Sequence, residues 1–147
     1  MFKHFLIPTD GSALSGRAIK AGIKFAAAIG ARITFYRATD EDIGIYVGEG
    51  YAIPRELRMR AAREVRARIE ADLGMARKEA GAAGVSSDWV IGKTDVPWKG
   101  IVDTAKRRKC DAIVMASHGR GGLKGMLIGS VTQKVLTHCR IPVVVYR

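Results

Sequence analysis

Cysteine, proline and aromatic residues are scarce in this chain of 147 residues. It has two cysteines and four prolines, and 7% of its residues are aromatic. Cys110 and Cys139 are too few for a disulfide framework and have no metal-binding spacing. We therefore expect both thiols to be reduced and to act as small hydrophobic residues, with redox sensing as the alternative.

Long hydrophobic runs are also absent. The apolar run at 141–146 is far shorter than the roughly 20 residues that cross a bilayer, and the N-terminus lacks the regions of a signal peptide. We expect a cytoplasmic protein with no membrane partner. The hydrophobic fraction of 48% excludes intrinsic disorder, and the length predicts one domain over residues 1–147.

Acidic residues are outnumbered by basic ones. There are 14 Asp and Glu against 25 Lys and Arg, a formal net charge of +11. The basic residues are spread along the chain, and the six arginines between Arg55 and Arg68 share their segment with glutamates. We interpret them as solvated faces, because no basic platform interleaved with aromatics indicates nucleic-acid binding. A basic module that binds acidic partners through this segment is one alternative function.

Apolar runs alternate with helical patterns from end to end. Val- and Ile-rich strands separated by helices predict a parallel sheet with helices on both faces. The fold class is therefore α/β: a single-domain, doubly wound, five-stranded parallel sheet that is Rossmann-like. The expected strands are 2–8, 33–38, 85–91, 112–116 and 142–146. The expected helices run from a cap at Ser12 or Ser15 to Gly30, from Pro54 to 81–84, over 97–108 and over 129–138. Residues 39–53 are expected to be a loop.

A crevice is expected where the strand order reverses, at the carboxyl ends of the first and fourth strands. There Thr9 and Asp10 would face the glycine-rich stretch 117–130. Asp10 either accepts hydrogen bonds from a ribose or base, or serves as a turn or cap residue.

The stretch 113–130 has the composition of a phosphate cradle: an apolar strand, a glycine-rich loop and then a helix that opens on Gly-Ser. Glycine lets a phosphate approach the backbone, and the amino end of the helix supplies free N–H groups and the positive end of its dipole. Gly119 and Gly129 would provide the close approach, and Ser117, Ser130 and Thr132 would provide hydroxyl groups. Arg120 and Lys124 are weaker candidates for neutralising phosphate. The alternative is a plain surface loop.

Catalytic and metal-binding motifs are missing. Gly92-Lys-Thr94 lacks the glycine-rich lead-in of a P-loop, and a dinucleotide Gly-x-Gly is absent after the first strand. The three histidines have no metal-ligand spacing. His118 has no identifiable orienting partner for general-base catalysis. The sequence thus predicts neither a catalytic residue nor a metal ligand.

Three motifs resemble the universal stress protein family, and the resemblance covers essentially the whole chain. Ile7-Pro-Thr-Asp-Gly-Ser12 resembles the family's opening strand and turn. Ala116-Ser-His-Gly119, followed after nine residues by Gly129-Ser130, resembles its nucleotide-binding pattern Gly-x2-Gly-x9-Gly-Ser/Thr. The closing Ile141-Pro-Val-Val-Val145 resembles its last strand.

The resemblance to the nucleotide-binding branch implies a site for ATP or another adenine nucleotide such as AMP, with or without Mg²⁺. It also implies a homodimer formed through the last strand, Val143–Tyr146. Ala116 stands where the family pattern has glycine, so its methyl group either crowds the ligand or is accommodated at negative φ. Ala38, where the family usually has valine, would leave a looser slot for the base. The resemblance implies as site residues Pro8, Thr9, Asp10, Ala38, Met115, Ala116, Gly119, Gly129, Ser130, Val131 and Thr132. The loop residues Ser117 and His118 complete the predicted site.

The function predicted from the sequence is that of a stress-response protein acting as a homodimeric switch with an adenine nucleotide as its ligand. A slow ATP hydrolase is the second alternative to this function. It is less favoured because no base or Mg²⁺-binding acidic pair can be identified.

Overall fold

Five parallel strands form the central sheet of the protein, in the order β5-β2-β1-β6-β7. The structure is a computed structural model and describes residues 1–40, 46–47, 51–120 and 128–147. The strands of the sheet are β1 (His4–Pro8), β2 (Arg32–Thr39), β5 (Ser87–Lys93), β6 (Ala112–Ala116) and β7 (Val143–Tyr146). The helices are α1 (Ala13–Ile29), α2 (Arg55–Ala82), α3 (Pro97–Arg107) and α4 (Ser130–His138). The predicted α/β fold is confirmed, with strand boundaries within two residues of those expected.

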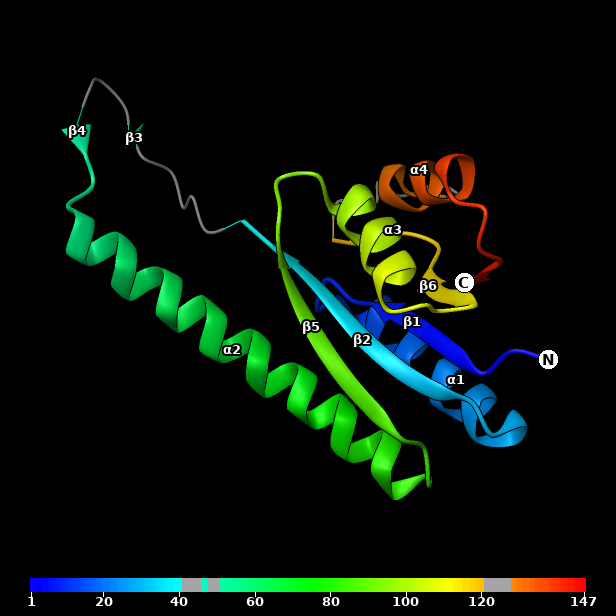
Figure 1. Ribbon diagram of the computed structural model, residues 1–147. Helices are drawn as coiled ribbons and strands as arrows, with labels where there is room; N and C mark the ends of the chain where they lie inside the picture. The colour runs from blue at the N-terminus through cyan, green and yellow to red at the C-terminus, as the bar shows by residue number, and fades with distance from the viewer. Residues whose placement is uncertain (41–45, 48–50, 121–127) are drawn as a thin grey trace.

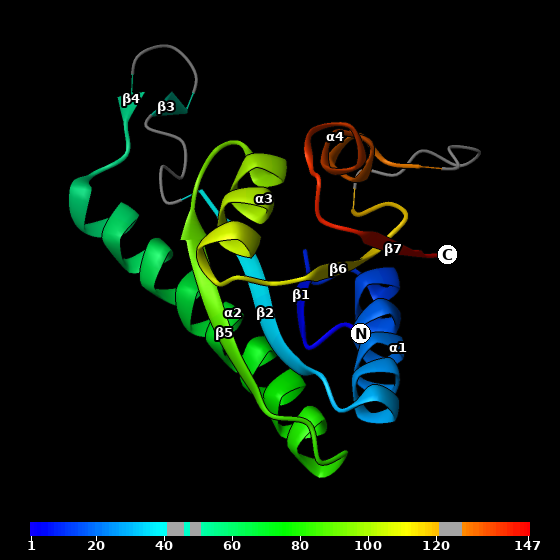
Figure 2. The same ribbon diagram turned by 45° about the vertical axis from the view of Figure 1, so that its right-hand side comes forward.

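Two helices cover each face of the sheet (Figures 1 and 2). Phe5 and Ile7 point to the face that packs against α1 and α2, whereas Leu6 points to the face under α3 and α4. All three side chains are fully buried. The alternation is that of a strand covered on both sides, which is why β1 is apolar at every position.

The strand order reverses at β1, as expected. β1 pairs in parallel with β2 on one side and with β6 on the other. The chain leaves β1 at Thr9 and leaves β6 at Ser117, so these two exits lie at the same edge of the sheet. The Thr9 amide donates to the Tyr36 carbonyl, which ties the first exit to β2.

Helix α1 begins and ends as its sequence indicates. Ser12 is the N-cap, and its hydroxyl accepts a hydrogen bond from the Ser15 amide. Gly30 closes the helix in the left-handed region with φ of 68°, which glycine adopts without strain. These caps fix the start of α1 directly after the turn that follows β1.

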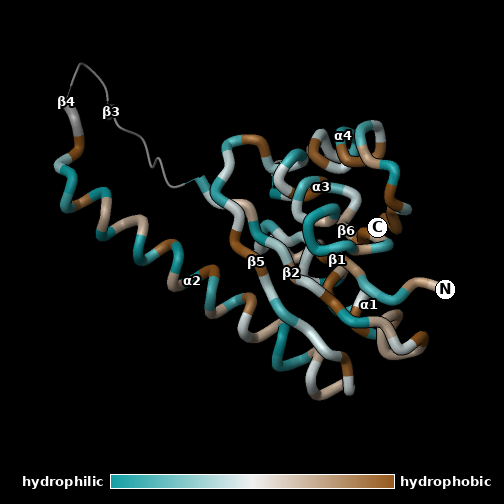
Figure 3. The backbone as a smooth tube through the Cα atoms, in the orientation of Figure 1, coloured by the Kyte–Doolittle hydropathy of each residue, from teal (hydrophilic) through white to brown (hydrophobic). Residues whose placement is uncertain are grey.

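Helix α2 is longer than the sheet it packs on, and its outer half extends past β5 (Figures 1 and 3). Ile69 and Leu73 in its second half are buried, but Leu57 and Val65 in its first half are exposed. The apolar stripe read from the sequence therefore contacts the core only along part of its length. Arg60 and Arg66 form ion pairs with glutamates one turn further on, as a solvated face would.

Residues 39–53 are not wholly a loop. Tyr46–Val47 (β3) and Tyr51–Ala52 (β4) pair as a two-stranded antiparallel hairpin, and Thr39 belongs to β2. The prediction of a loop was wrong at these positions, because two-residue strands are too short to give a periodic pattern. None of the described helices is long and apolar enough to span a membrane.

Candidate functional site

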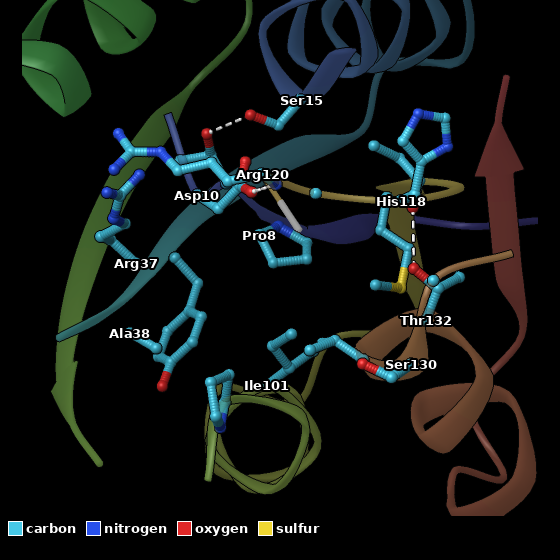
Figure 4. A pocket seen from close by; sticks show the side chains of 18 residues that line it. Pro8, Asp10, Ser15, Arg37, Ala38, Ile101, His118, Arg120, Ser130 and Thr132 are labelled. Carbon is cyan, nitrogen blue, oxygen red and sulfur yellow. Dashed lines mark hydrogen bonds between the residues drawn. The ribbon is translucent and has the colours of Figure 1, made fainter. Parts of the chain in front are cut away.

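A cavity of about 430 Å³ opens at the carboxyl ends of β1, β2 and β6 (Figure 4). The amino ends of α3 and α4 complete its walls. Its volume lies within the usual range of small-molecule sites. The lining residues are Pro8, Thr9, Asp10, Ser15, Tyr36, Arg37, Ala38, Pro97, Ile101, Met115, Ala116, His118, Gly119, Arg120, Gly129, Ser130, Val131 and Thr132.

Segments about a hundred residues apart in sequence thus meet in one pocket. Every predicted site residue lines it except Ser117, which is buried. The weaker candidate Arg120 lines it as well, whereas Lys124 lies outside the described residues.

Asp10 holds the two exits together. Its Oδ1 accepts from the Ser12 amide at 3.0 Å, and its Oδ2 accepts from the Arg120 amide at 2.7 Å. Burial alone would raise the pKa of this carboxyl, but hydrogen bonds from Ser12 and from the Arg120 amide outweigh burial, so that the pKa is lowered. Asp10 is therefore a turn residue, and it also lines the pocket.

Gly119 makes room for that carboxylate. A Cβ built at position 119 would collide with Asp10 Oδ2. Any other residue here would push Asp10 away from the Arg120 amide. The glycine that we expected to admit a phosphate thus admits a side chain of the protein itself.

The amino end of α4 faces the pocket without a capping side chain. Gly129 is its N-cap, and the first residues of the helix, Ser130, Val131 and Thr132, all line the cavity. By contrast, α1 is capped by Ser12. The first-turn N–H groups of α4 have no partner within the helix, so they are available to a ligand together with the positive end of the dipole.

Two of the predicted hydroxyl donors have other partners. The Thr132 hydroxyl donates to the Ala116 carbonyl at 2.9 Å and is buried. The Ser117 hydroxyl lies 3.1 Å from His118 Nδ1, and the Ser117 backbone bonds to Tyr146 and Gly129. Both side chains fix the loop around the pocket, which leaves Ser130 as the exposed hydroxyl at the α4 end.

Ala116 lines the pocket, and its methyl group contacts α1. The side chain packs with Leu14 and Ala18 of α1, while Met115 before it faces the other side of the sheet. Among the described non-glycine residues only Lys109 has positive φ, so Ala116 has an ordinary backbone. The negative φ is the condition under which we expected the methyl group to be accommodated.

Five further lining residues were missed from the sequence: Ser15, Tyr36, Arg37, Pro97 and Ile101. Ile101 on α3 is buried in the core as well as lining the pocket. Tyr36 and Arg37 precede Ala38 on β2, and their place at the carboxyl end of a central strand is the signal that could have identified them.

The described lining is poor in metal-binding groups. Among the described residues no group of three His, Cys, Asp or Glu side chains could hold a metal ion. Asp10 is the only acidic residue of the described lining, and both its oxygens already accept backbone hydrogen bonds. These residues do not fit a Mg²⁺ ion held by protein carboxylates.

Sequence comparison relates the chain to known proteins over its whole length. The model of the universal stress protein family matches residues 1–147. A universal stress protein of Methanocaldococcus jannaschii is 31% identical, with 100% of this chain and 83% of the relative covered. One of Thermus aquaticus is 32% identical, with both chains covered completely.

Solved structures with the same fold include proteins with bound nucleotides. The M. jannaschii protein MJ0577 superposes with a TM-score of 0.78 at 26% identity, covering 99% of this chain and 95% of that one. A universal stress protein in complex with cAMP gives 0.68 at 25%, covering 99% and 97%. One from Archaeoglobus fulgidus in complex with dAMP gives 0.63 at 18%, covering 100% and 98%, which bears on the fold alone.

Proposed function

The chain belongs to the universal stress protein family, and we propose that it binds an adenine nucleotide, ATP or AMP, in the pocket at the carboxyl ends of β1, β2 and β6. In this proposal it is a stress-response protein that uses the nucleotide as a switch ligand. The solved universal stress protein in complex with cAMP supports adenine as the base.

The observation that carries the proposal is the uncapped amino end of α4 at the pocket wall. Ser130 is exposed there, and the first-turn N–H groups have no side-chain cap. An anionic phosphate satisfies these donors and is stabilised by the helix dipole. A plain surface loop would not leave such an end facing a cavity.

The rest of the lining suits a nucleoside. Pro8 and Ala38 offer apolar surface for a base, with Asp10 between β1 and the loop. Asp10 retains lone pairs that can accept from ribose hydroxyls. We therefore place the base near Ala38, the ribose near Asp10 and the 5′-phosphates at Ser130. A Mg²⁺ ion would depend on the phosphates, since no carboxylate pair of the described lining serves it.

We further propose that two copies pair through β7. β7 hydrogen-bonds to β6 on one side only and forms an edge of the sheet. Val144 on this strand is 39% exposed. An apolar edge strand is a template for pairing with another strand, and a second copy would cover it symmetrically.

Isothermal calorimetry of nucleotide-stripped protein with ATP and with AMP tests the nucleotide proposal. We expect saturable binding that Ser130→Asp weakens at least about tenfold, because a carboxylate would occupy the anion-binding end of α4. The same substitution favours the helix dipole, so the variant should not lose thermal stability.

Gln133→Asp is the matched control. Gln133 lies on the same helix, is exposed and does not line the pocket. The Gln133→Asp variant should bind nucleotide with the same affinity as the unmodified protein. Absence of binding at millimolar ATP, or equal affinity in the Ser130→Asp variant, would contradict the proposal.

A further inference from the structure

Two arginines converge beside Asp10, and the nucleotide proposal uses neither. Arg37 is half-buried near the end of β2, and Arg120 is exposed just after Gly119. A Cβ built on Gly11 would lie 2.8 Å from a terminal nitrogen of Arg37 and 2.9 Å from one of Arg120. Both guanidinium groups therefore border the same small volume above Gly11.

Neither guanidinium has an ion pair or side-chain hydrogen bond in the part of the chain that the structure describes. Burial lowers the pKa of Arg37, and the nearby charge of Arg120 lowers it further, while Asp10 and Asp72 act in the opposite direction. Two like charges held together and partly desolvated are unfavourable until an anion lies between them.

The pair lies at the opposite end of the pocket from α4. In Figure 4 the side chains of Arg37 and Arg120 extend together toward one side, whereas Ser130 and Thr132 lie on the other. Arg37 also lines a second cavity, of about 650 Å³, between α1 and α2. The pocket thus has two separate regions that favour negative charge.

We infer that Arg37 and Arg120 form a second anion subsite, which takes a phosphate group while the amino end of α4 holds the 5′-phosphate. Guanidinium groups match phosphate oxygens through paired N–H donors, which makes arginine suited to this role. The two positive charges exceed the single negative charge of the adjacent Asp10 carboxylate, so a dianion is still attracted.

Two kinds of ligand carry a phosphate group that this subsite would bind. This part of the inference rests on the proposed function: if the ribose lies at Asp10, a phosphate on its 2′ or 3′ oxygen is the ligand group nearest the pair. The other source is free inorganic phosphate that binds beside a 5′-mononucleotide. With either source, phosphate binding depends on Arg37 and Arg120. Titration with each ligand distinguishes the two sources.

The experiment compares adenosine 3′,5′-bisphosphate and adenosine 2′,5′-bisphosphate with AMP by calorimetry. We expect at least one bisphosphate to bind about tenfold or more tightly than AMP, and this ratio to fall to about one in Arg37→Gln and in Arg120→Gln. Arg37→Lys should keep only part of the gain in affinity of the bisphosphate over AMP. Lysine keeps the positive charge but lacks the paired N–H donors of the guanidinium group. Arg17→Gln is the control, since Arg17 is exposed on α1 and lines neither cavity.

A second titration uses inorganic phosphate against sodium chloride of equal ionic strength. If AMP affinity or the melting temperature rises with phosphate, and both arginine variants lose the effect, the subsite is supported with free phosphate as its source. If AMP does not bind but phosphate still stabilises the protein through the arginines, the subsite stands and the nucleotide proposal fails.

The inference is overturned if AMP binds but neither bisphosphate gains affinity and phosphate has no effect. It is also overturned if Arg17→Gln changes the ratio as much as the pocket variants do. If AMP binds but neither the bisphosphates nor phosphate has the expected effect, the proposed nucleotide site still stands.

Discussion

At the scale of single residues, Gly119 and Ala116 show that two positions of the glycine-rich motif have different structural requirements. Gly119 is required because Asp10 occupies the space of its absent side chain. Ala116 is tolerated because β6 turns its side chain toward α1. Both residues line the pocket, but only position 119 needs to be glycine.

Ala116→Gly should therefore leave nucleotide affinity unchanged within about twofold. The variant loses a buried methyl group and gains backbone freedom in a strand, so we expect it to lower the free energy of unfolding by about 1 kcal/mol. Calorimetry and urea denaturation measure the two quantities. A strong rise in affinity would mean that the methyl group does crowd the ligand.

His4 makes the stability of the protein depend on pH. It is 4% exposed, its Nε2 lies 2.8 Å from Thr34 Oγ1, and burial lowers its pKa below the ordinary 6.5. Between the lowered value and 6.5 the unfolded chain binds the proton and the folded one does not. The contribution of His4 to the free energy of unfolding is therefore fully present above pH 6.5, and it falls as the pH drops below 6.5.

Urea denaturation at intervals between pH 7.5 and 5.5 should show this decline, with a limiting slope of about 1.4 kcal/mol per pH unit. His4→Gln should remove this part of the slope, whatever its effect on stability at pH 7.5. His138→Gln, at an exposed position, is the control. An equal slope in the His4→Gln variant would assign the pH dependence to other groups.

At the scale of elements, the difference between α1 and α4 defines the site. Both helices begin at the same edge of the sheet, but only α1 has a side-chain cap. A capped end has satisfied donors and stabilises the fold, whereas an uncapped end beside a cavity keeps donors for a ligand. The sequence gives the reason directly, since Ser12 precedes α1 and Gly129 precedes α4.

The edge strand β7 carries the prediction for assembly. We expect sedimentation to show a dimer for the unmodified protein and a monomer for Val144→Lys, because a lysine on an apolar edge opposes strand pairing. Val65→Lys places the same charge at a similarly exposed valine, 42% against 39%, on α2. It should remain dimeric. A monomeric unmodified protein would contradict the proposed pairing.

At the scale of the whole molecule, the strand order creates the pocket. Because β1 has β2 on one side and β6 on the other, the loops that leave β1 and β6 diverge to opposite faces and leave a crevice between them. The described arginines of α2 lie along a helix whose outer half projects from the sheet. Within the described ranges, Arg37 and Arg120 bring positive charge from two other segments together beside Asp10.

The fold and most of the pocket were predictable because they depend on local patterns. Apolar alternation, the Ser12 and Gly30 caps and the glycine spacing are properties of neighbouring residues, and they place Asp10 and Ser130 at the same edge. The exposed half of α2 and the β3–β4 hairpin were not predictable. A helical stripe has the same period whether or not a partner covers it, and a two-residue strand has no period.

The sequence by itself determined the parallel sheet, its reversal at β1 and most of the residues that surround the crevice, since strand and helix periods and the caps are written in consecutive residues. Only the tertiary structure decided that Asp10 bonds to the Arg120 amide, that Ala116 faces α1 and that Arg37 lies against Arg120. Such contacts join residues about 80 to 110 positions apart in the sequence. Their geometry depends on which face of each strand a side chain leaves from and on what packs there, which no local pattern records.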